Sequence, residues 1–139
     1  MKRIVLKFGG TSVGSIEKII NAAKIVKKRH EESNEIIVVV SAMSGTTNDL
    51  INRAKNISDN FNKSELDVLM SSGEQISSAL LAGSLIELGI QARSWMGWQI
   101  PIFTNENHTS SQIMEIKTEE ILNFISKKGV AVIAGFQGI

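Results

Sequence analysis

Three short apolar runs, Ile4–Phe8, Ile36–Val40 and Val130–Ala134, stand out along the chain because they show little alternation of apolar and polar residues. Runs of this length that are rich in β-branched residues are typical of strands buried on both faces of a parallel sheet. Between the first two runs, apolar residues recur at helical spacing from Ile16 to Val26, and the cations of the segment 27–29 follow. Cations favour the negative end of a helix dipole. The pattern predicts a β-α-β opening.

The middle of the chain predicts two more helices. The first runs from about Thr47 to Ile57, and the polar stretch Asp59–Lys63 forms a loop after it. Ser64 with Asp67 resembles a capping box for a longer helix, which we expect to reach Leu88 before Gly89.

The remaining segments predict smaller elements before the last strand. Pro101 favours an edge position, because proline cannot donate a hydrogen bond to a sheet. We expect short strands at Ala92–Trp95 and Gln99–Phe103, a polar loop at Asn105–Ser111 and a helix at Ile116–Lys128. Strands that alternate with helices predict an α/β fold, here a three-layer α/β/α sandwich with a mainly parallel sheet.

Composition narrows the class of protein. The chain has 139 residues, 42% of them hydrophobic and 21% charged, which is ordinary for one globular domain. Fifteen basic and 14 acidic residues give a net charge of +1 without long blocks of one sign, so we expect neither a nucleic-acid surface nor a membrane patch. Cysteine is absent, and no apolar stretch approaches the roughly 18 residues of a membrane helix. These features predict a cytoplasmic protein.

The stretch KFGGTSVGS, residues 7 to 15, places a lysine and three glycines between the first strand and the first helix. It matches neither the Walker loop nor the dinucleotide fingerprint. Adjacent glycines still let backbone N–H groups approach an anion, and Lys7 would add a point charge there. In the alternative interpretation Gly9 and Gly10 only form a tight turn, and Lys7 extends its ammonium group to solvent.

Each of the three apolar strands ends in a loop of small or polar residues: Gly9–Ser12, Ser41–Thr47 and Gly135–Gly138. Ligands of open parallel sheets bind beyond the carboxyl ends of the strands, so we expect these loops to share one rim. For Ser41 and Thr47 the alternative is a local role as helix caps.

The stretch SSGEQ, residues 71 to 75, interrupts the predicted long helix with a glycine. Gly73 would let another backbone pass closely, and Glu74 would accept a hydrogen bond from an ammonium or hydroxyl group of a ligand. A solvated polar face with a packing glycine explains the same residues. His30 and His108 have no ligand-like spacing and are expected on the surface. Trp95 and Trp98 could line a pocket, although packing is the usual role of such residues.

Four stretches taken together resemble the aspartate kinases of the amino-acid kinase family, in particular the monofunctional bacterial enzymes. They are KFGGTSVGS, VVVSAMSGTTNDL from Val38, SSGEQIS from Ser71 and AVIAGFQG from Ala131, and their order and spacing match as well. The resemblance covers essentially the whole chain. Other amino-acid kinases, such as glutamate or uridylate kinases, are disfavoured because KFGGTS with SSGEQ is more particular to aspartate kinases.

The resemblance implies an activity and roles for single residues. The family phosphorylates the side-chain carboxylate of L-aspartate with ATP and Mg²⁺, the first step toward lysine, threonine and methionine. By resemblance, aspartate would be held by Thr47 and Glu74, the catalytic residue would be Lys7, and none of the site residues would bind metal. The nucleotide phosphates would be held by Lys7, Phe8, Gly9, Gly10, Thr11 and Ser41.

The resemblance also implies that the chain is the N-terminal, phosphate- and aspartate-binding portion of a kinase domain. We therefore expect a sheet that is incomplete at its C-terminus, no regulatory ACT domain, and either self-association or a complementing C-terminal half. The stretch from Trp95 to Trp98 is bulkier than the family pattern. The alternative function is that of a catalytically incompetent fragment that acts at most as an anion-binding or interaction module.

Overall fold

The computed structural model describes all residues from Met1 to Ile139. Its helices are α1 (Ile16–Glu31), α2 (Thr46–Ile57), α3 (Lys63–Glu87) and α4 (Glu119–Ser126). Its strands are β1 (Arg3–Phe8), β2 (Glu35–Val40), β3 (Ala92–Trp95), β4 (Ile102–Thr104), β5 (Ile113–Ile116) and β6 (Val130–Ala134).

The main sheet has four parallel strands in the order β1-β2-β6-β3. Strands β4 and β5 form a separate antiparallel pair. The three apolar runs of the sequence are therefore neighbouring parallel strands, as predicted, and β6 reaches its place between β2 and β3 from the end of the chain.

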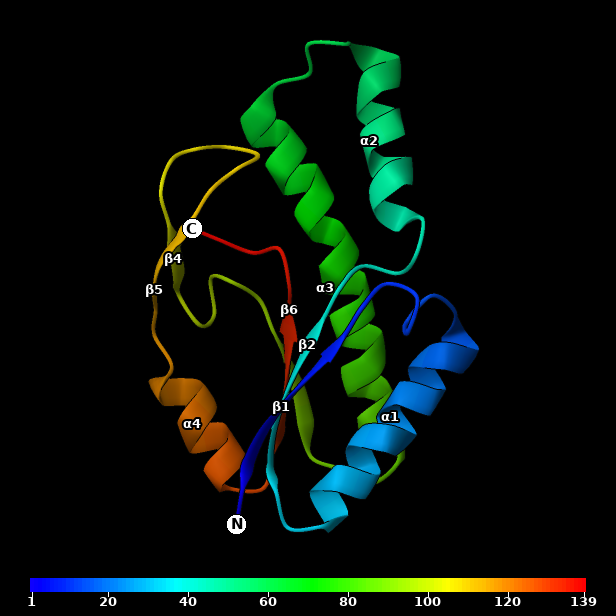
Figure 1. The fold of residues 1–139 in the computed structure, drawn as a ribbon, viewed down its shortest axis with the longest axis vertical. Coiled ribbons are helices and arrows are strands. Elements are labelled where there is room, and N and C mark those ends of the chain that lie inside the picture. The colour runs from blue at the N-terminus through cyan, green and yellow to red at the C-terminus, as the bar shows by residue number, and fades with distance from the viewer.

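Helices cover the sheet on both faces (Figure 1). On one face α1 and α3 bury the larger core cluster, which includes Ile19, Val38 and Leu81, and α2 packs on α3. On the other face α4 buries a smaller cluster around Trp95 and Ile125. The predicted three-layer sandwich is confirmed.

Strand β1 is not buried on both faces of the sheet, contrary to the prediction. It lies at one edge of the sheet, and its residues alternate between exposed and half-buried. Ile4, Leu6 and Phe8 pack against the larger core cluster, whereas Val5 on the other face is 61% exposed. The apolar character of β1 predicted the strand correctly but not its position at an edge.

The start of α3 also differs from the prediction. Its N-cap residue is Asn62, whose side chain accepts a hydrogen bond from the Glu65 amide at 3.1 Å. The Ser64 hydroxyl donates to the same Asn62 oxygen at 2.6 Å, so Ser64 lies inside the helix and forms no capping box with Asp67. The asparagine two residues upstream already supplies the acceptor that a cap requires.

The segment between β3 and α4 contains the largest differences. The expected strand Gln99–Phe103 begins only at Ile102, because Pro101 lies in a turn. The expected helix Ile116–Lys128 begins only at Glu119, because Ile113–Ile116 pairs with β4 as β5. Ile113 and Ile116 are three residues apart, which is helical spacing and not the alternation of a strand, so only the pairing with β4 reveals β5.

Both histidines lie on the surface, as expected. The His30 ring contacts the Lys128 carbonyl at 2.8 Å, and the His108 ring contacts the Asp67 carboxylate at 2.9 Å. Trp95 is buried, packs edge-on against Phe124 and also lines a cavity beside α4, whereas Trp98 is 56% exposed. None of the helices combines the length and the apolar character that crossing a bilayer requires.

Candidate active site at the carboxyl end of the sheet

The loops that follow β1, β2 and β6 meet at one edge of the sheet, as the sequence predicted. The Ser41 amide donates to the Phe8 carbonyl at 3.0 Å, and the Gly135 amide donates to the Val40 carbonyl at 2.9 Å. These bonds continue the parallel ladder beyond the strand ends. They bring the three loops into a single surface. We call this surface the rim and define it by the segments 7–12, 41–47 and 135–138, together with Glu74 of α3, which lies beside Gly135.

Two glycines allow the loops of the rim to approach each other. A Cβ atom on Gly10 would lie 3.0 Å from the Ala42 carbonyl oxygen, and one on Gly135 would lie 2.9 Å from the Val40 carbonyl oxygen. No atom lies within 4 Å of the corresponding position at Gly9, which is exposed. Gly10 therefore has a packing role, while the surroundings of Gly9 leave room for a ligand.

Lys7 is the cation of the rim. It lies one residue before the end of β1, opposite Val39 of β2, and its side chain is exposed. The ammonium group forms neither a hydrogen bond nor an ion pair with the protein. Phe8 beside it is half-buried on the core cluster, and Thr11 is exposed in the following turn. Lys7 is therefore free to meet an anion at the mouth of the glycine loop.

The helix ends at the rim exclude the alternative that Ser41 and Thr47 are helix caps. The N-terminus of α1 lies beyond the glycine loop, and the Ser15 side chain caps it by accepting from the Lys18 amide at 3.2 Å. The N-cap residue of α2 is Gly45, with φ of 86° and no side-chain cap. Neither Ser41 nor Thr47 caps a helix, so the capping alternative does not account for them.

Glu74 is the acid of the rim, and it is buried. Its side chain points from α3 toward β6, because the Cβ position of Gly135 lies 3.9 Å from the Glu74 Cγ atom. The residue is 8% exposed, and its Oε2 atom is buried without a hydrogen-bond partner. Burial raises the pKa of the Glu74 carboxyl, and hydrogen bonds from backbone amides, first that of Ala42, oppose this effect. The alternative of a solvated polar face is therefore wrong for Glu74.

Gly73 explains how α3 reaches the rim. A Cβ atom there would lie 2.8 Å from the Ala42 Cβ atom and 3.4 Å from the Thr46 Cγ2 atom. Gly73 was expected to let another backbone pass closely, but the atoms nearest to it are side-chain atoms of Ala42 and Thr46 in the segment that follows β2. This contact sets Glu74 beside the Ser41–Thr47 loop.

Two polar residues that were not among the predicted site residues hold the rim together. Ser77 is fully buried and donates its hydroxyl hydrogen bond to the Ser41 carbonyl at 2.7 Å. The Gln137 side-chain amide donates to the Ser71 carbonyl at 3.1 Å. Ser77 lies one helical turn after Gly73 on the buried face of α3. The serine at this spacing from the glycine is the feature of the sequence from which its contact with the rim could have been predicted.

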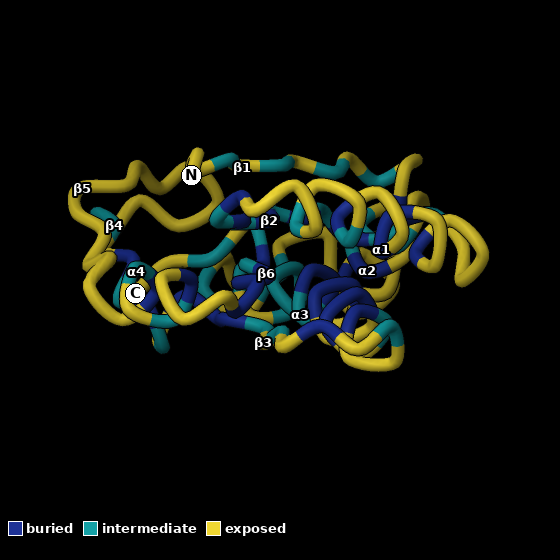
Figure 2. The backbone as a smooth tube through the Cα atoms, turned by 90° about the horizontal axis from the view of Figure 1, so that it is seen from below, coloured by how far each residue is buried: buried dark blue, intermediate teal, exposed yellow.

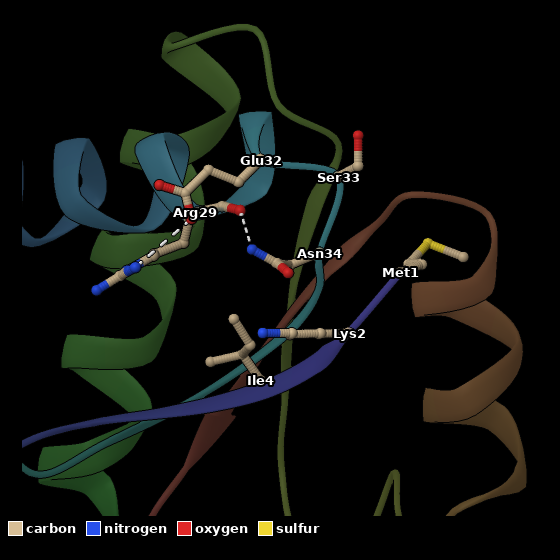
Figure 3. A pocket seen from close by; sticks show the side chains of 7 residues that line it. All are labelled: Met1, Lys2, Ile4, Arg29, Glu32, Ser33 and Asn34. Atoms are coloured by element: carbon tan, nitrogen blue, oxygen red, sulfur yellow. Dashed lines mark hydrogen bonds and ion pairs between the residues drawn. The ribbon is translucent and has the colours of Figure 1, made fainter.

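Two cavities of the structure lie away from the rim. Figure 3 shows one of them at the amino end of β1, where Asn34 donates a hydrogen bond to the Arg29 carbonyl at 2.8 Å. The other lies beside α4 and β3. No group of three or more His, Cys, Asp or Glu side chains is placed to hold a metal ion.

Comparison with known proteins identifies the class to which this fold and rim belong. The model of the amino acid kinase family matches residues 2–139. The chain therefore belongs to the amino acid kinase family.

The similar curated proteins are aspartate kinases. The chain is 49% identical over 136 residues to the aspartokinase of Geobacillus stearothermophilus, covering 98% of this chain and 33% of that protein. It is also 49% identical to aspartate kinase Ask_LysC of Stutzerimonas stutzeri, covering 100% of this chain and 34% of that protein. The chain thus spans about a third of the length of the curated relatives it matches.

Solved structures show the same fold. The aspartate kinase from Synechocystis superposes with a TM-score of 0.85 at 41% identity, over 99% of this chain and 22% of that one. E. coli aspartokinase III, solved with aspartate and ADP, gives a TM-score of 0.76 at 21% identity over 93% of this chain and 40% of that one. At 21% identity, the likeness to E. coli aspartokinase III concerns the fold alone.

Proposed function

We propose that this chain forms the phosphate- and aspartate-binding part of a cytoplasmic aspartate kinase, which transfers the γ-phosphoryl group of ATP to the side-chain carboxylate of L-aspartate. The product, aspartyl phosphate, would enter the biosynthesis of lysine, threonine and methionine. The observation that carries the proposal is the rim itself, where an unpaired Lys7 ammonium group occurs together with the buried Glu74 carboxylate, whose Oε2 atom has no hydrogen-bond partner. The similarity to aspartokinases supports the same reaction.

The cationic part of the rim suits the phosphates. Lys7 would neutralise charge on the transferring phosphoryl group, as single lysines do in phosphoryl transfer. Gly9 leaves its backbone accessible, and Gly10, Thr11 and Ser41 line the same surface. Backbone N–H groups of such loops bind anions well, because no side chain keeps the ligand away.

The acidic part of the rim suits the amino group of an amino acid. The Oε2 atom of Glu74 is buried without a partner, and leaving a buried acceptor unpaired costs about 1–3 kcal/mol. A substrate ammonium group would supply the missing donor and counter the burial of the carboxylate. Thr47, half-buried in the first turn of α2, would hold aspartate from the neighbouring loop.

The reaction requires little from the protein beyond positioning the two substrates and stabilising charge on the transferring phosphoryl group. The side chain of aspartate has an unperturbed pKa of about 3.9, so it is ionised near neutrality and needs no general base. A carboxylate oxygen would bond to the γ-phosphorus while the bond to the β–γ bridging oxygen breaks, and ADP would leave. Charge stabilisation at the transferring group by Lys7 fits this chemistry.

Magnesium would accompany ATP in the proposed reaction. Mg²⁺ is commonly held by one or two carboxylates together with substrate phosphates. The described residues contain no cluster of metal-ligating side chains, so we assign no metal ligand and derive no step from the metal.

The test uses a chimaera in which this chain replaces the matching third of the Geobacillus stearothermophilus aspartokinase, to which it is 49% identical. We expect ADP release that depends on L-aspartate and is absent with L-glutamate. Formation of aspartyl phosphate would be measured by trapping with hydroxylamine. A folded chimaera that binds ATP but releases ADP equally with and without L-aspartate would contradict the proposal.

A further inference from the structure

The loop between β4 and β5 is anchored on α3 through a single carboxylate. The Thr109 amide donates to both oxygens of Asp67, at 3.0 Å to Oδ1 and 3.1 Å to Oδ2. The His108 ring contacts the same Oδ2 atom through Nδ1 at 2.9 Å. Asp67 therefore joins α3 to a segment that lies 41 and 42 positions further along the chain.

Burial does little to hold this loop in place. Residues 106–120 are all exposed, and Figure 2 shows the chain around β4 and β5 mostly in the colour of exposed residues. The base of the loop is closed at Asn105, whose side-chain oxygen accepts from the Gln112 amide at 3.1 Å and whose own amide donates to the Gln112 carbonyl at 3.1 Å. The position of the tip therefore depends on its hydrogen bonds to α3.

The backbone at the tip is strained, and the strain serves the anchor. Thr109 has a φ of 68°, a left-handed conformation that a β-branched residue rarely adopts and that persists where the surroundings determine it. In this conformation its amide meets the Asp67 carboxylate, and hydrogen bonds to carboxylates are stronger than those between neutral groups. The His108 contact contributes less, because the His108 and Asp67 side chains are 52% and 27% exposed.

The face of α3 that carries the anchor also carries the acid of the rim. Asp67, Ser71 and Glu74 follow one another at intervals of four and three residues, so they lie on one side of the helix. The Ser71 carbonyl accepts from the Gln137 side chain at 3.1 Å. This side of α3 therefore meets the loop, the rim segment 135–138 and the substrate acid in succession. At 1.5 Å per residue, Asp67 lies about 10 Å from Glu74 along the helix axis.

The loop is also connected to the rim at its base. Ile139, which directly follows the rim segment 135–138, donates to the Ile102 carbonyl at 2.8 Å and accepts from the Thr104 amide at 2.8 Å. The loop thus begins at a strand that pairs with the end of the rim, and its tip rests on α3. Figure 1 shows the yellow segment between β4 and β5 reaching toward the amino-terminal half of α3, beyond the end of β6. The loop therefore stands on the Glu74 side of the rim.

We propose that Asp67 is a positioning residue that holds the loop 105–112 as the outer wall of the aspartate-binding half of the rim, an inference that rests on the proposed function. Asp67 bonds to the loop and not to the substrate. The wall confines the amino acid on the side of Glu74. Lys7 and Gly9 belong to β1 and the loop after it, at the other edge of the sheet, so the wall leaves the phosphate-binding half unchanged.

The test compares three variants of the chimaera. Asp67→Ala removes the anchor, whereas Asp67→Asn keeps an oxygen that can accept from the Thr109 amide. Glu65→Ala is the matched control, because Glu65 is an exposed acid two residues earlier in the same helix. Hydrogen exchange of the Thr109 amide, followed by NMR, reports on the anchor. Steady-state kinetics with each substrate varied in turn reports on the wall, and urea unfolding verifies that each variant is folded.

We expect the Thr109 amide to exchange at least about 10-fold faster in Asp67→Ala than in the unchanged chimaera, because the loop tip opens locally. KM for aspartate should rise roughly 10-fold in this variant, while KM for ATP should change by less than about twofold. Asp67→Asn should restore most of both properties, and Glu65→Ala should leave both unchanged.

Unchanged exchange of the Thr109 amide in Asp67→Ala would overturn the anchor. Faster exchange with an unchanged KM for aspartate would overturn the wall, and an equal rise in KM for both substrates would reduce Asp67 to a general structural role. The proposed function is judged separately on the unchanged chimaera. ADP release that does not depend on aspartate there would contradict the proposed function, whereas the exchange of the Thr109 amide would still measure the anchor.

Discussion

Gly73 of α3 lies directly against Ala42 of the loop after β2, where a Cβ atom at position 73 would be 2.8 Å from the Ala42 Cβ atom. The helix therefore approaches the rim closely only because position 73 carries no side chain. Glu74 follows immediately, so the same contact fixes where the buried carboxylate enters the site. The cost of a glycine inside a helix, about 1 kcal/mol relative to alanine, is offset by this packing.

Gly73→Ala should destabilise the protein, because overpacking of this kind costs typically about 1–3 kcal/mol and exceeds the gain in helix propensity. Gly83→Ala is the matched control. Gly83 lies in the same helix with no atom within 4 Å of its Cβ position, so alanine there should stabilise by about 0.5–1 kcal/mol. Urea unfolding of both variants gives the comparison, and equal stabilisation by the two substitutions would show that α3 can move away from Ala42 at no cost.

The sequence predicted most of the fold because its apolar runs are short and clearly separated. The position of β1 at an edge of the sheet could not be predicted, because an apolar residue such as Val5 gives the same sequence pattern whether or not a helix covers it. The strand β5 was also missed, because Ile113 and Ile116 are three residues apart and do not show the alternation of a strand; only their pairing with Thr104 and Ile102 reveals it.

The rim could be anticipated from the rule that ligands bind at the carboxyl ends of parallel strands. The burial of Glu74 could not, because it depends on how α3 packs against β6 and on the absence of a side chain at Gly73. The bond between Ser77 and the Ser41 carbonyl joins residues 36 positions apart, and nothing local in the sequence indicates it.

Glu74→Gln should increase stability at neutral pH while it weakens aspartate binding. Burial raises the pKa of the Glu74 carboxyl above 4.5, so the folded state disfavours the ionised form. The resulting loss of stability is absent below the unfolded-state pKa, grows as the pH rises through the folded-state pKa, and is constant above it. The advantage of glutamine should therefore appear over this window in urea unfolding measured at several pH values.

In the chimaera, Glu74→Gln should raise KM for aspartate roughly 10- to 100-fold, the equivalent of one hydrogen bond to a charged group. KM for ATP should change much less. Steady-state kinetics with each substrate varied in turn gives both values. An unchanged KM for aspartate would remove Glu74 from the substrate site and leave its burial without a functional explanation.

Lys7→Ala should lower kcat of the chimaera by roughly 10²- to 10³-fold, the effect of removing one preorganised electrostatic donor. Lys24→Ala is the control, since Lys24 is an exposed lysine of α1 and lies outside the rim. Because the Lys7 stem lies on a strand, the folding of the variant is checked by its unfolding curve. A folded Lys7→Ala variant with normal kcat would return Lys7 to the simpler interpretation of a solvated cation at a strand end.

The 139-residue chain by itself should show negligible aspartate kinase activity. Lys7 and Gly9 are exposed, and the chain spans only about a third of the length of the curated relatives it matches, so the substrates would meet only part of a site. A coupled assay for ADP, run on this chain and on the chimaera at equal concentration, tests the expectation. Robust turnover by the chain alone that depends on ATP and aspartate would show that these residues suffice for catalysis.

The same 139-residue chain should self-associate through β1. Its open backbone edge and the exposed Val5 side chain form an unprotected edge strand, and such strands pair with each other. A lysine at this position is the protection that natural edge strands use, so Val5→Lys should shift the chain toward the monomer. Val68→Lys adds the same charge at a site of similar exposure, 66%, away from the edge and should leave association unchanged. Sedimentation velocity over a range of concentrations distinguishes the three proteins, and a wild-type chain that stays monomeric throughout would show that the edge of β1 is not adhesive.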